Sequence, residues 1–346
     1  MSAALRVGIA SAVASAAILA VFLLSGAYEP VDLLFPGQRG VGAEITARDF
    51  GLERLPDRFS YDGQEIYVIA RELPDLDAAS DAGVLAFRMR RILQPAIASI
   101  PPPGTPTVLT LAGLNVLGVG LAAGALADLA ARHGRDPRGG YAAAVMLSFP
   151  LIITTTEPLA FGLGLFGLAL VDRSRWGWAT AALALAGLSR ETALVMAVAA
   201  ALTLVWRGHR AVAFALLAGS TLPLAVWSLW LGQQVPADTY RSSKLLGFLD
   251  MPAPSLVDVL SCSAAVVLMV AGVWRWRDVP LLALTSLGFL ACCAFYIGDQ
   301  YQFHGLPRVS AAAMAIGAAG LLPFRRRPPA LPPEGSSRPV APPLPA

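Results

Sequence analysis

The sequence predicts an all-α polytopic membrane protein with about ten transmembrane helices, and three observations support this fold class. Only 14% of the 346 residues are charged and 56% are hydrophobic, whereas soluble domains carry roughly a quarter charged residues. Several apolar runs reach the length of about 18 residues at which a helix crosses a bilayer. Basic residues recur in every second loop between these runs, as the positive-inside rule expects.

The first predicted span covers residues 7–24, which are almost entirely apolar and follow a single basic residue, Arg6. Ser25, Gly26 and Ala27 resemble the small residues of a signal-peptide cleavage site, so a cleaved leader is the alternative. The apolar run is longer than the hydrophobic region of a usual signal peptide. We therefore expect this segment to be retained as a membrane anchor.

Residues 28–105 form a long, mostly polar segment that contains much of the acidic charge. Apolar residues between Tyr61 and Ala70 recur near helical spacing, which predicts an amphipathic helix on the bilayer surface. Residues 92–100 predict a short interfacial helix, because Pro101, Pro102 and Pro103 end the run before it could span. This segment is expected to be the first outer loop.

The rest of the chain alternates apolar runs with short loops, within a predicted transmembrane domain of residues 1–325. The Pro-rich residues 326–346 are expected to be a disordered cytosolic tail. The pairs 141–172 and 176–206 have short members, and the apolar pattern leaves open whether each is a hairpin or a broken helix. The expected spans after the first are 106–131, 141–156, 158–172, 176–189, 191–206, 211–231, 256–274, 280–297 and 307–324.

Charge in the short loops predicts the topology. Every second loop is basic and falls on the same side as Arg6, which assigns that side, and both termini, to the cytoplasm. The formal net charge of +3 is small, and nothing in the sequence indicates a nucleic-acid partner. The basic loops contain Arg132, Arg135 and Arg138; Arg173 and Arg175; Arg207 and Arg210; Arg275 and Arg277; and Arg325, Arg326 and Arg327.

The unusual polar residues then fall on the outer face, where charge at membrane depth tends to be paired or functional. Each has a simpler alternative. Glu157 follows three threonines and would favour a helix N-terminus, Arg190 and Glu191 would form a salt bridge between helix ends, and His304 would be a surface residue. The arginines of residues 88–91 would contact lipid headgroups, or bind a lipid-linked phosphate through their planar guanidinium groups.

Asp62 has the clearest catalytic interpretation among these residues. Gly63 beside it allows close backbone approach, and a carboxylate at this position is suited to act as a general base on an acceptor hydroxyl. A nearby arginine group would stabilise a departing phosphate. The alternative is an ordinary Asp-Gly turn in a loop.

These motifs, YDGQEIYVIA at residues 61–70 and RMRRILQP at 88–95, resemble the first outer loop of bacterial GT-C-type membrane glycosyltransferases, including mannosyltransferase-like members. TTTEPLAFGLGLFGLALV and ALALAGLSRETALVMAVAAAL resemble later parts of that family, and LPRVSAAAMAIGAAGLLP resembles its last span. The likeness covers roughly residues 1–325 by order and spacing. The sequence departs from the family in having Glu65 and Ile66, rather than an aromatic pair, after DGQ.

The resemblance implies a GT-C-like enzyme of the bacterial inner membrane, with its active site on the periplasmic face. It implies a polyprenyl-phosphate sugar donor, surrounding membrane lipids, and a glycan or lipid acceptor. Asp62 matches the presumed base, and no cofactor is indicated, although the outer acids have the chemistry to hold a divalent metal. The residues expected to contact substrate are Gln64, Tyr67, Arg88, Arg90, Arg91, Glu157, Arg190, Glu191, His304 and Arg308.

Two other function classes stay open. A lipid or small-molecule transporter or flippase would show internal repeats and helix breaks at mid-membrane depth, and no clear repeat is found. A non-catalytic subunit of an envelope glycan assembly system would keep the fold without a working base. Substituting Asp62 discriminates these classes from an enzyme.

Overall fold

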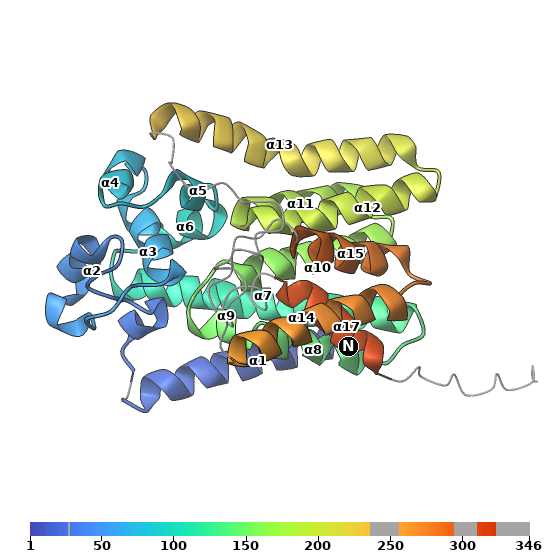
Figure 1. Cartoon of the computed structure of the whole chain (residues 1–346), viewed down its shortest axis with the longest axis horizontal. Helices are drawn as coiled ribbons and strands as arrows, with labels where there is room; N and C mark the ends of the chain where they lie inside the picture. The colour runs from blue at the N-terminus through green and yellow to red at the C-terminus, as the bar shows by residue number, and fades with distance from the viewer. Residues whose placement is uncertain (27, 236–255, 294–309, 323–346) are drawn as a thin grey trace, which may run out of the picture.

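The computed structural model describes residues 1–26, 28–235, 256–293 and 310–322, and all regular structure in these ranges is helical (Figure 1). The all-α prediction is therefore confirmed for the part of the chain that the structure describes. The elements of the bundle are α1 (Ala3–Leu24), α7 (Thr105–Arg132), η3 (Pro137–Gly140), α8 (Tyr141–Met146), α9 (Ser148–Ile152), α10 (Glu157–Asp172), α11 (Trp176–Ser189), η4 (Glu191–Ala193), α12 (Leu194–Trp206), α13 (Arg210–Gln234), α14 (Leu256–Arg275), α15 (Pro280–Cys293) and α17 (Ala311–Leu321).

Three of these helices, α1, α7 and α13, are long and apolar enough to cross a membrane, with 22, 28 and 25 residues. The remaining apolar helices are shorter, so ten full-length spans are not confirmed. The predicted span 141–156 is not one helix: it is divided into α8 and α9 and ends in a turn at which Thr154 has a φ of 47°. Pro150 lies within this stretch and Pro158 follows it, and proline restricts a continuous helix.

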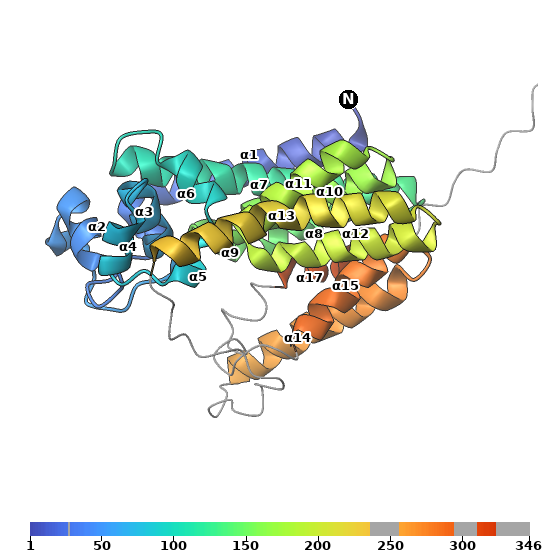
Figure 2. The ribbon, with the colours of Figure 1, turned by 90° about the horizontal axis from the view of Figure 1, so that it is seen from above.

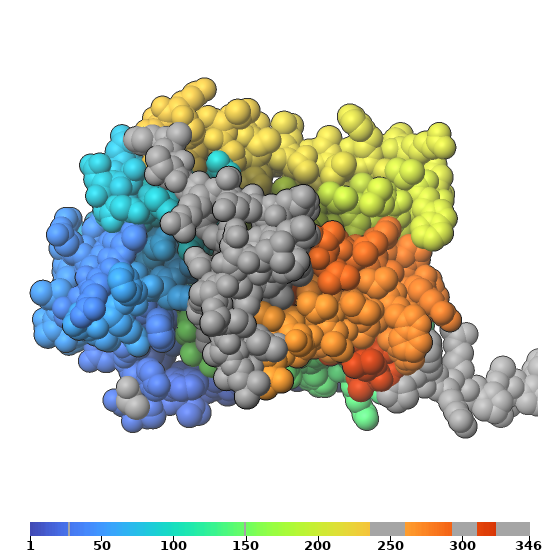
Figure 3. Space-filling view, in the orientation of Figure 1, coloured from blue at the N-terminus to red at the C-terminus, as the bar shows by residue number. Residues whose placement is uncertain are grey.

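Residues 28–105 fold into a compact set of short helices at one end of the bundle, which we call the outer segment (Figures 1 and 2). In the space-filling view, the outer segment forms one end of the visible face (Figure 3). Its elements are η1 (Pro30–Leu34), α2 (Ala43–Phe50), η2 (Leu52–Arg54), α3 (Asp62–Glu72), α4 (Leu76–Asp81), α5 (Ala86–Met89) and α6 (Leu93–Ala98).

The two helices predicted in the outer segment are present as α3 and α6, but α3 does not expose its apolar side chains. Tyr67, Val68 and Ile69 are at most 1% exposed, because the other elements of this segment cover them. The outer segment is also joined to the bundle, since the indole of Trp227 on α13 donates to the carbonyl of Met89 at 3.0 Å. The protein itself, rather than a lipid surface, covers this helix.

The end of the bundle opposite the outer segment gathers the loops that were predicted to be basic. Asp172 at the end of α10 pairs with Arg132 of α7 at 2.7 Å, and lies 3.8 Å from Arg207 after α12. Arg173 pairs with Asp128 at 2.6 Å. Arg135 also lies 3.2 Å from Asp278, so four of the predicted basic loops lie together at one end, as a shared membrane side requires.

The centre of the bundle depends on a close crossing of α7 and α10. A Cβ on Gly118 of α7 would overlap the carbonyl of Pro158, and a Cβ on Gly162 of α10 would overlap the carbonyl of Gly118. These obstacles are backbone atoms, which cannot rotate away as a side chain would. Glycine at both positions therefore allows the two helices to touch and fixes where the Thr-rich turn before α10 lies.

Replacing Gly118 with alanine is expected to lower the free energy of unfolding by about 1–3 kcal/mol, the usual cost of overpacking a tight interior. Gly113 on the same helix is the matched control, because nothing lies within 4 Å of a Cβ placed there. Gly113→Ala should raise the free energy of unfolding by up to about 1 kcal/mol, because alanine has a higher helix propensity than glycine. Thermal unfolding of both variants in detergent checks this, and equal melting temperatures would contradict the crossing.

Candidate active site

The first turn of α3 lies directly against the Thr-rich turn before α10. A Cβ on Gly63 would lie 2.7 Å from the carbonyl oxygens of both Leu34 and Ile153. Only glycine allows this approach, because any side chain would push the helix away from both carbonyls. Gly63 therefore brings Asp62, the first residue of α3, to the turn that leads into Glu157.

Asp62 is 5% exposed and faces two arginines of the outer segment. Its Oδ1 lies 2.6 Å from Nη1 of Arg88, and its Oδ2 lies 3.8 Å from Nη1 of Arg91. Arg88 also approaches Glu65, with 3.3 Å between its Nε and the Oε2 of that carboxylate. Arg88 thus bridges two carboxylates that lie one helical turn apart on the same face of α3.

Arg91 links the outer segment to the turn between α11 and α12. Its Nη2 donates to Oε1 of Glu191 at 2.8 Å and its Nε donates to Oε2 at 3.1 Å, which is the bidentate geometry favoured by guanidinium and carboxylate groups. Burial opposes the charge of Arg91, but Glu191 and then Asp62 outweigh it and raise the pKa of Arg91. The guanidinium therefore stays charged inside the protein.

A second ion pair lies deeper, between the start of α10 and the end of α11. Arg190 Nη1 is 2.9 Å from Oε1 of Glu157 and 3.4 Å from Oγ1 of Thr156. The side chains of Arg190 and Glu157 are 4% and 0% exposed. The charge of Glu157 also acts on Arg91, so the two groups of ion pairs are electrostatically connected.

We call this set of seven side chains the acid–arginine cluster. Its four carboxylates and three guanidinium groups give a formal charge of −1. The members come from the outer segment, the Thr-rich turn and the turn between α11 and α12; they are Asp62, Glu65, Arg88, Arg91, Glu157, Arg190 and Glu191.

The arginines of the cluster differ in their exposure. The side chain of Arg88 is 22% exposed, whereas those of Arg91 and Arg190 are 7% and 4% exposed. Glu65, the second carboxylate beside Arg88, has a raised pKa, because burial disfavours its charge more than Arg88 favours it. An anion arriving from outside would therefore reach Arg88 first, in competition with Asp62 and a partly destabilised Glu65 carboxylate.

Six of the predicted site residues are thus brought together: Asp62, Arg88, Arg91, Glu157, Arg190 and Glu191. Arg90, in the same basic run, is exposed to solvent at the end of α5 and does not join the cluster. Arg88 and Arg91, the other arginines of this run, do reach the cluster. His304 and Arg308 lie outside the described residues.

Gln64 and Tyr67 are on α3 but serve its attachment to the surrounding loops. The side chain of Gln64 accepts from the backbone of Gly37 at 2.8 Å and donates to the carbonyl of Val41 at 2.9 Å. The hydroxyl of Tyr67 donates to Asp49 at 2.5 Å and accepts from the backbone of Gly104 at 2.9 Å. Both side chains are fully buried, so their polar atoms hold the outer segment together.

Sequence reasoning placed Glu65 on the outer face without assigning it to the site, and it considered Thr156 only as a residue that would cap the helix beginning near Glu157. The signal for Glu65 was its spacing of three residues from Asp62 within a predicted helix. Within the described residues, no group of three or more His, Cys, Asp or Glu side chains is arranged to hold a metal ion. The chemistry that the cluster offers is a buried carboxylate beside an accessible guanidinium group.

A polar hollow of about 570 Å³ lies in the outer segment. Glu72, the last residue of α3, is one of the residues that line it. Hydrogen-bonding side chains of this kind are suited to hydroxyl-rich ligands. The charged and amide residues that line the hollow are Gln38, Glu44, Arg48, Glu72 and Asp81.

No family model, no curated protein and no solved structure matches this chain.

Proposed function

We propose that this chain is an integral membrane glycosyltransferase that transfers a sugar from a polyprenyl-phosphate donor to a glycan or lipid acceptor of the cell envelope. The observation that carries the proposal is the acid–arginine cluster, in which Asp62 lies 2.6 Å from the most exposed arginine of the set. The cluster lies at the end of the bundle away from the basic loops, and the positive-inside rule supports assigning that end to the outer face of a bacterial inner membrane. In this topology both termini are cytoplasmic.

The reaction needs two groups that the cluster supplies. The acceptor hydroxyl oxygen forms a bond to the anomeric carbon while the bond from that carbon to the donor phosphate breaks, which inverts the configuration. The hydroxyl proton passes to the carboxylate of Asp62, acting as general base. The electron pair of the broken bond leaves with the phosphate, whose growing charge is stabilised by Arg88.

This assignment gives Arg88 a defined change of partner. In the structure described here its guanidinium group bridges Asp62 and Glu65. The donor phosphate would replace Asp62 as a partner of Arg88, because two phosphate oxygens can accept parallel hydrogen bonds from the planar guanidinium fork. Asp62 would then lose its closest cation and become a better base at the moment when the donor is bound.

The closed pairing of the cluster also favours a second candidate, a transporter or flippase for the same lipid, or a non-catalytic subunit. Each arginine of the cluster pairs with at least one carboxylate, which is an arrangement that can simply join helices. The enzyme differs from both of these alternatives in bond cleavage. A transporter moves the lipid-linked sugar intact, whereas a glycosyltransferase releases polyprenyl phosphate.

The test uses purified protein in liposomes supplied with a set of radiolabelled polyprenyl-phosphate hexoses and an envelope extract as acceptor. Labelled product together with free polyprenyl phosphate is expected. Intact donor crossing the bilayer without cleavage would support the transporter and overturn the enzyme. Glycan analysis of a deletion strain identifies the sugar and the acceptor, and unchanged envelope glycans would contradict the proposal.

A further inference from the structure

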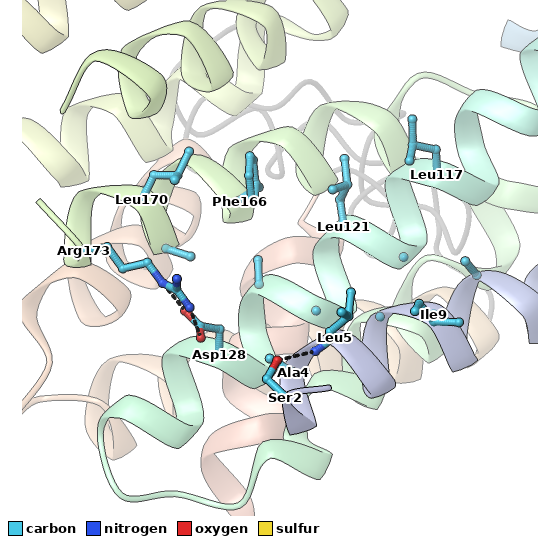
Figure 4. A pocket seen from close by; sticks show the side chains of 16 residues that line it. Ser2, Ala4, Leu5, Ile9, Leu117, Leu121, Asp128, Phe166, Leu170 and Arg173 are labelled. Atoms are coloured by element: carbon cyan, nitrogen blue, oxygen red, sulfur yellow. Dashed lines mark hydrogen bonds and ion pairs between the residues drawn. The ribbon is translucent and has the colours of Figure 1, made fainter. Parts of the chain in front are cut away.

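A groove of about 440 Å³ runs between α1, α7 and α10 at the end of the bundle opposite the acid–arginine cluster (Figure 4). Leu117, Leu121 and Phe166 line one side, and Leu5 and Ile9 line the other. The volume falls within the range of roughly 300–1,000 Å³ that is typical of small-molecule sites. The walls are almost entirely hydrocarbon, so the ligand must be largely apolar.

The groove exists because small residues face each other where α1 and α7 meet. A Cβ on Gly8 would lie 2.9 Å from the carbonyl oxygen of Gly120, and a Cβ on Gly120 would lie 2.9 Å from the Cβ of Ala12. The two helices therefore touch at their backbones, and no side chain extends from this contact toward α10. Leu5, Ile9 and Leu117 remain about half exposed along the opening, so the groove is open to the surroundings of the bundle.

One end of the groove is charged. Arg173 donates to the two carboxylate oxygens of Asp128 from its Nε at 3.0 Å and its Nη2 at 2.6 Å (Figure 4). A guanidinium group has five N–H donors, so this pair leaves donors on a side chain that is 50% exposed. Arg132 and Arg207 lie at the same end of the bundle, which makes this end attractive to an anion.

The length of the groove decides what kind of apolar ligand fits. From Asp128 to Leu117 along α7 there are eleven positions, or roughly 16 Å of helix. This is close to half of the hydrocarbon thickness of a bilayer, which is about 30 Å. A helix of a partner protein would need the whole thickness, whereas a phospholipid occupies one leaflet. In the part of the chain that the structure describes, α1 and α7 are two of the helices long and apolar enough to cross a membrane, and both line the groove together with α10.

We propose that this groove binds one anionic phospholipid from the leaflet opposite the acid–arginine cluster, with an acyl chain in the groove and its phosphate at Arg173. The site is separate from the glycosyl donor, which is expected at the other end of the bundle. The bound lipid would fill the space between α1 and α10 and fix the position of α1. The site does not depend on the proposed reaction.

Native mass spectrometry of delipidated protein tests this, with phosphatidylglycerol and phosphatidylcholine of identical chains as probes. Wild type should retain one phosphatidylglycerol in preference to phosphatidylcholine. Arg173→Gln should reduce that preference about fivefold, the effect of one basic residue near a membrane surface. Leu121→Trp should fill the groove and abolish retention of both lipids, while the melting temperature in detergent reports whether the fold is kept.

Two matched variants distinguish a built site from general attraction to a basic surface. Arg175→Gln removes an exposed charge two residues away that does not line the groove, and it should leave the preference unchanged. Asp128→Asn removes the competing carboxylate, and it should strengthen phosphatidylglycerol retention. The proposal would be overturned if Arg173→Gln and Arg175→Gln lost the phosphatidylglycerol preference equally, or if Asp128→Asn retained phosphatidylglycerol more weakly than wild type. Either result would count whatever the behaviour of the Leu121 variant.

Discussion

Replacing Asp62 with asparagine is expected to lower the rate of glycosyl transfer by about 10²–10⁴-fold, the usual contribution of a positioned general base. Asparagine has the same shape but cannot take the proton of the acceptor hydroxyl. The substitution leaves both arginines with a carboxylate partner, because Arg88 still lies 3.3 Å from Glu65 and Arg91 still lies 2.8 Å from Glu191. The protein is therefore expected to accumulate at its normal level.

The measurement is the initial rate of transfer in liposomes that contain equal amounts of wild-type and variant protein. Asp57→Asn is the matched control. Asp57 is an aspartate of the same outer segment that also pairs with an arginine at 2.6 Å, Arg39, but on the exposed surface. That variant should retain wild-type activity. A rate for Asp62→Asn within a factor of two of wild type would remove Asp62 from the role of base.

Much of the helical architecture follows from the apolar pattern of the sequence. The predicted runs 106–131, 158–172 and 176–189 correspond closely to α7, α10 and α11, because arginine or proline bounds each apolar run. The pattern does not reveal where a helix breaks inside an apolar run. Residues 141–156 were therefore predicted as one span, although they form α8, α9 and a turn of buried threonines.

Which residues make up the site could be predicted in part, because the alternation of basic loops alone placed them on one face of the membrane. The ion pairs between these residues could not be predicted. Arg91 and Glu191 are 100 positions apart, and only the packing of the outer segment against the helix ends selects them as partners. The same limit explains Arg90, which sequence proximity grouped with Arg88 and Arg91 although its side chain is exposed.

Helical geometry explains why the DGQ motif contributes fewer site residues than its letters suggest. At 100° per residue, Glu65 returns to the side of Asp62, whereas Gln64 and Tyr67 turn toward the opposite side of α3. There they bind the backbone of neighbouring loops. A motif read as a linear string does not separate these two faces, but a helical reading of the same string does.

The buried pair of Arg190 and Glu157 has the largest expected effect on stability. Arg190→Met is expected to lower the free energy of unfolding by about 3–5 kcal/mol, because it leaves a buried carboxylate without its arginine. Glu157 is 0% exposed, so water cannot replace the lost partner. Arg91 also acts on Glu157, which favours the lower part of that range. Unfolding of purified protein by denaturing detergent in mixed micelles gives the measurement.

The double variant Glu157→Met, Arg190→Met separates the ion pair from its surroundings. Replacing both charges with apolar groups of similar length removes the carboxylate that Arg190→Met separates from its arginine, and such replacements are often close to neutral. The double variant should therefore be more stable than Arg190→Met alone. Arg54→Met is the exposed control: its pair with Glu29 at 2.7 Å is about half exposed on both sides, and its loss should cost at most about 1 kcal/mol. If Arg190→Met costs no more than Arg54→Met, the pair does not hold the ends of α10 and α11 together, and the geometry of the whole cluster would need another source.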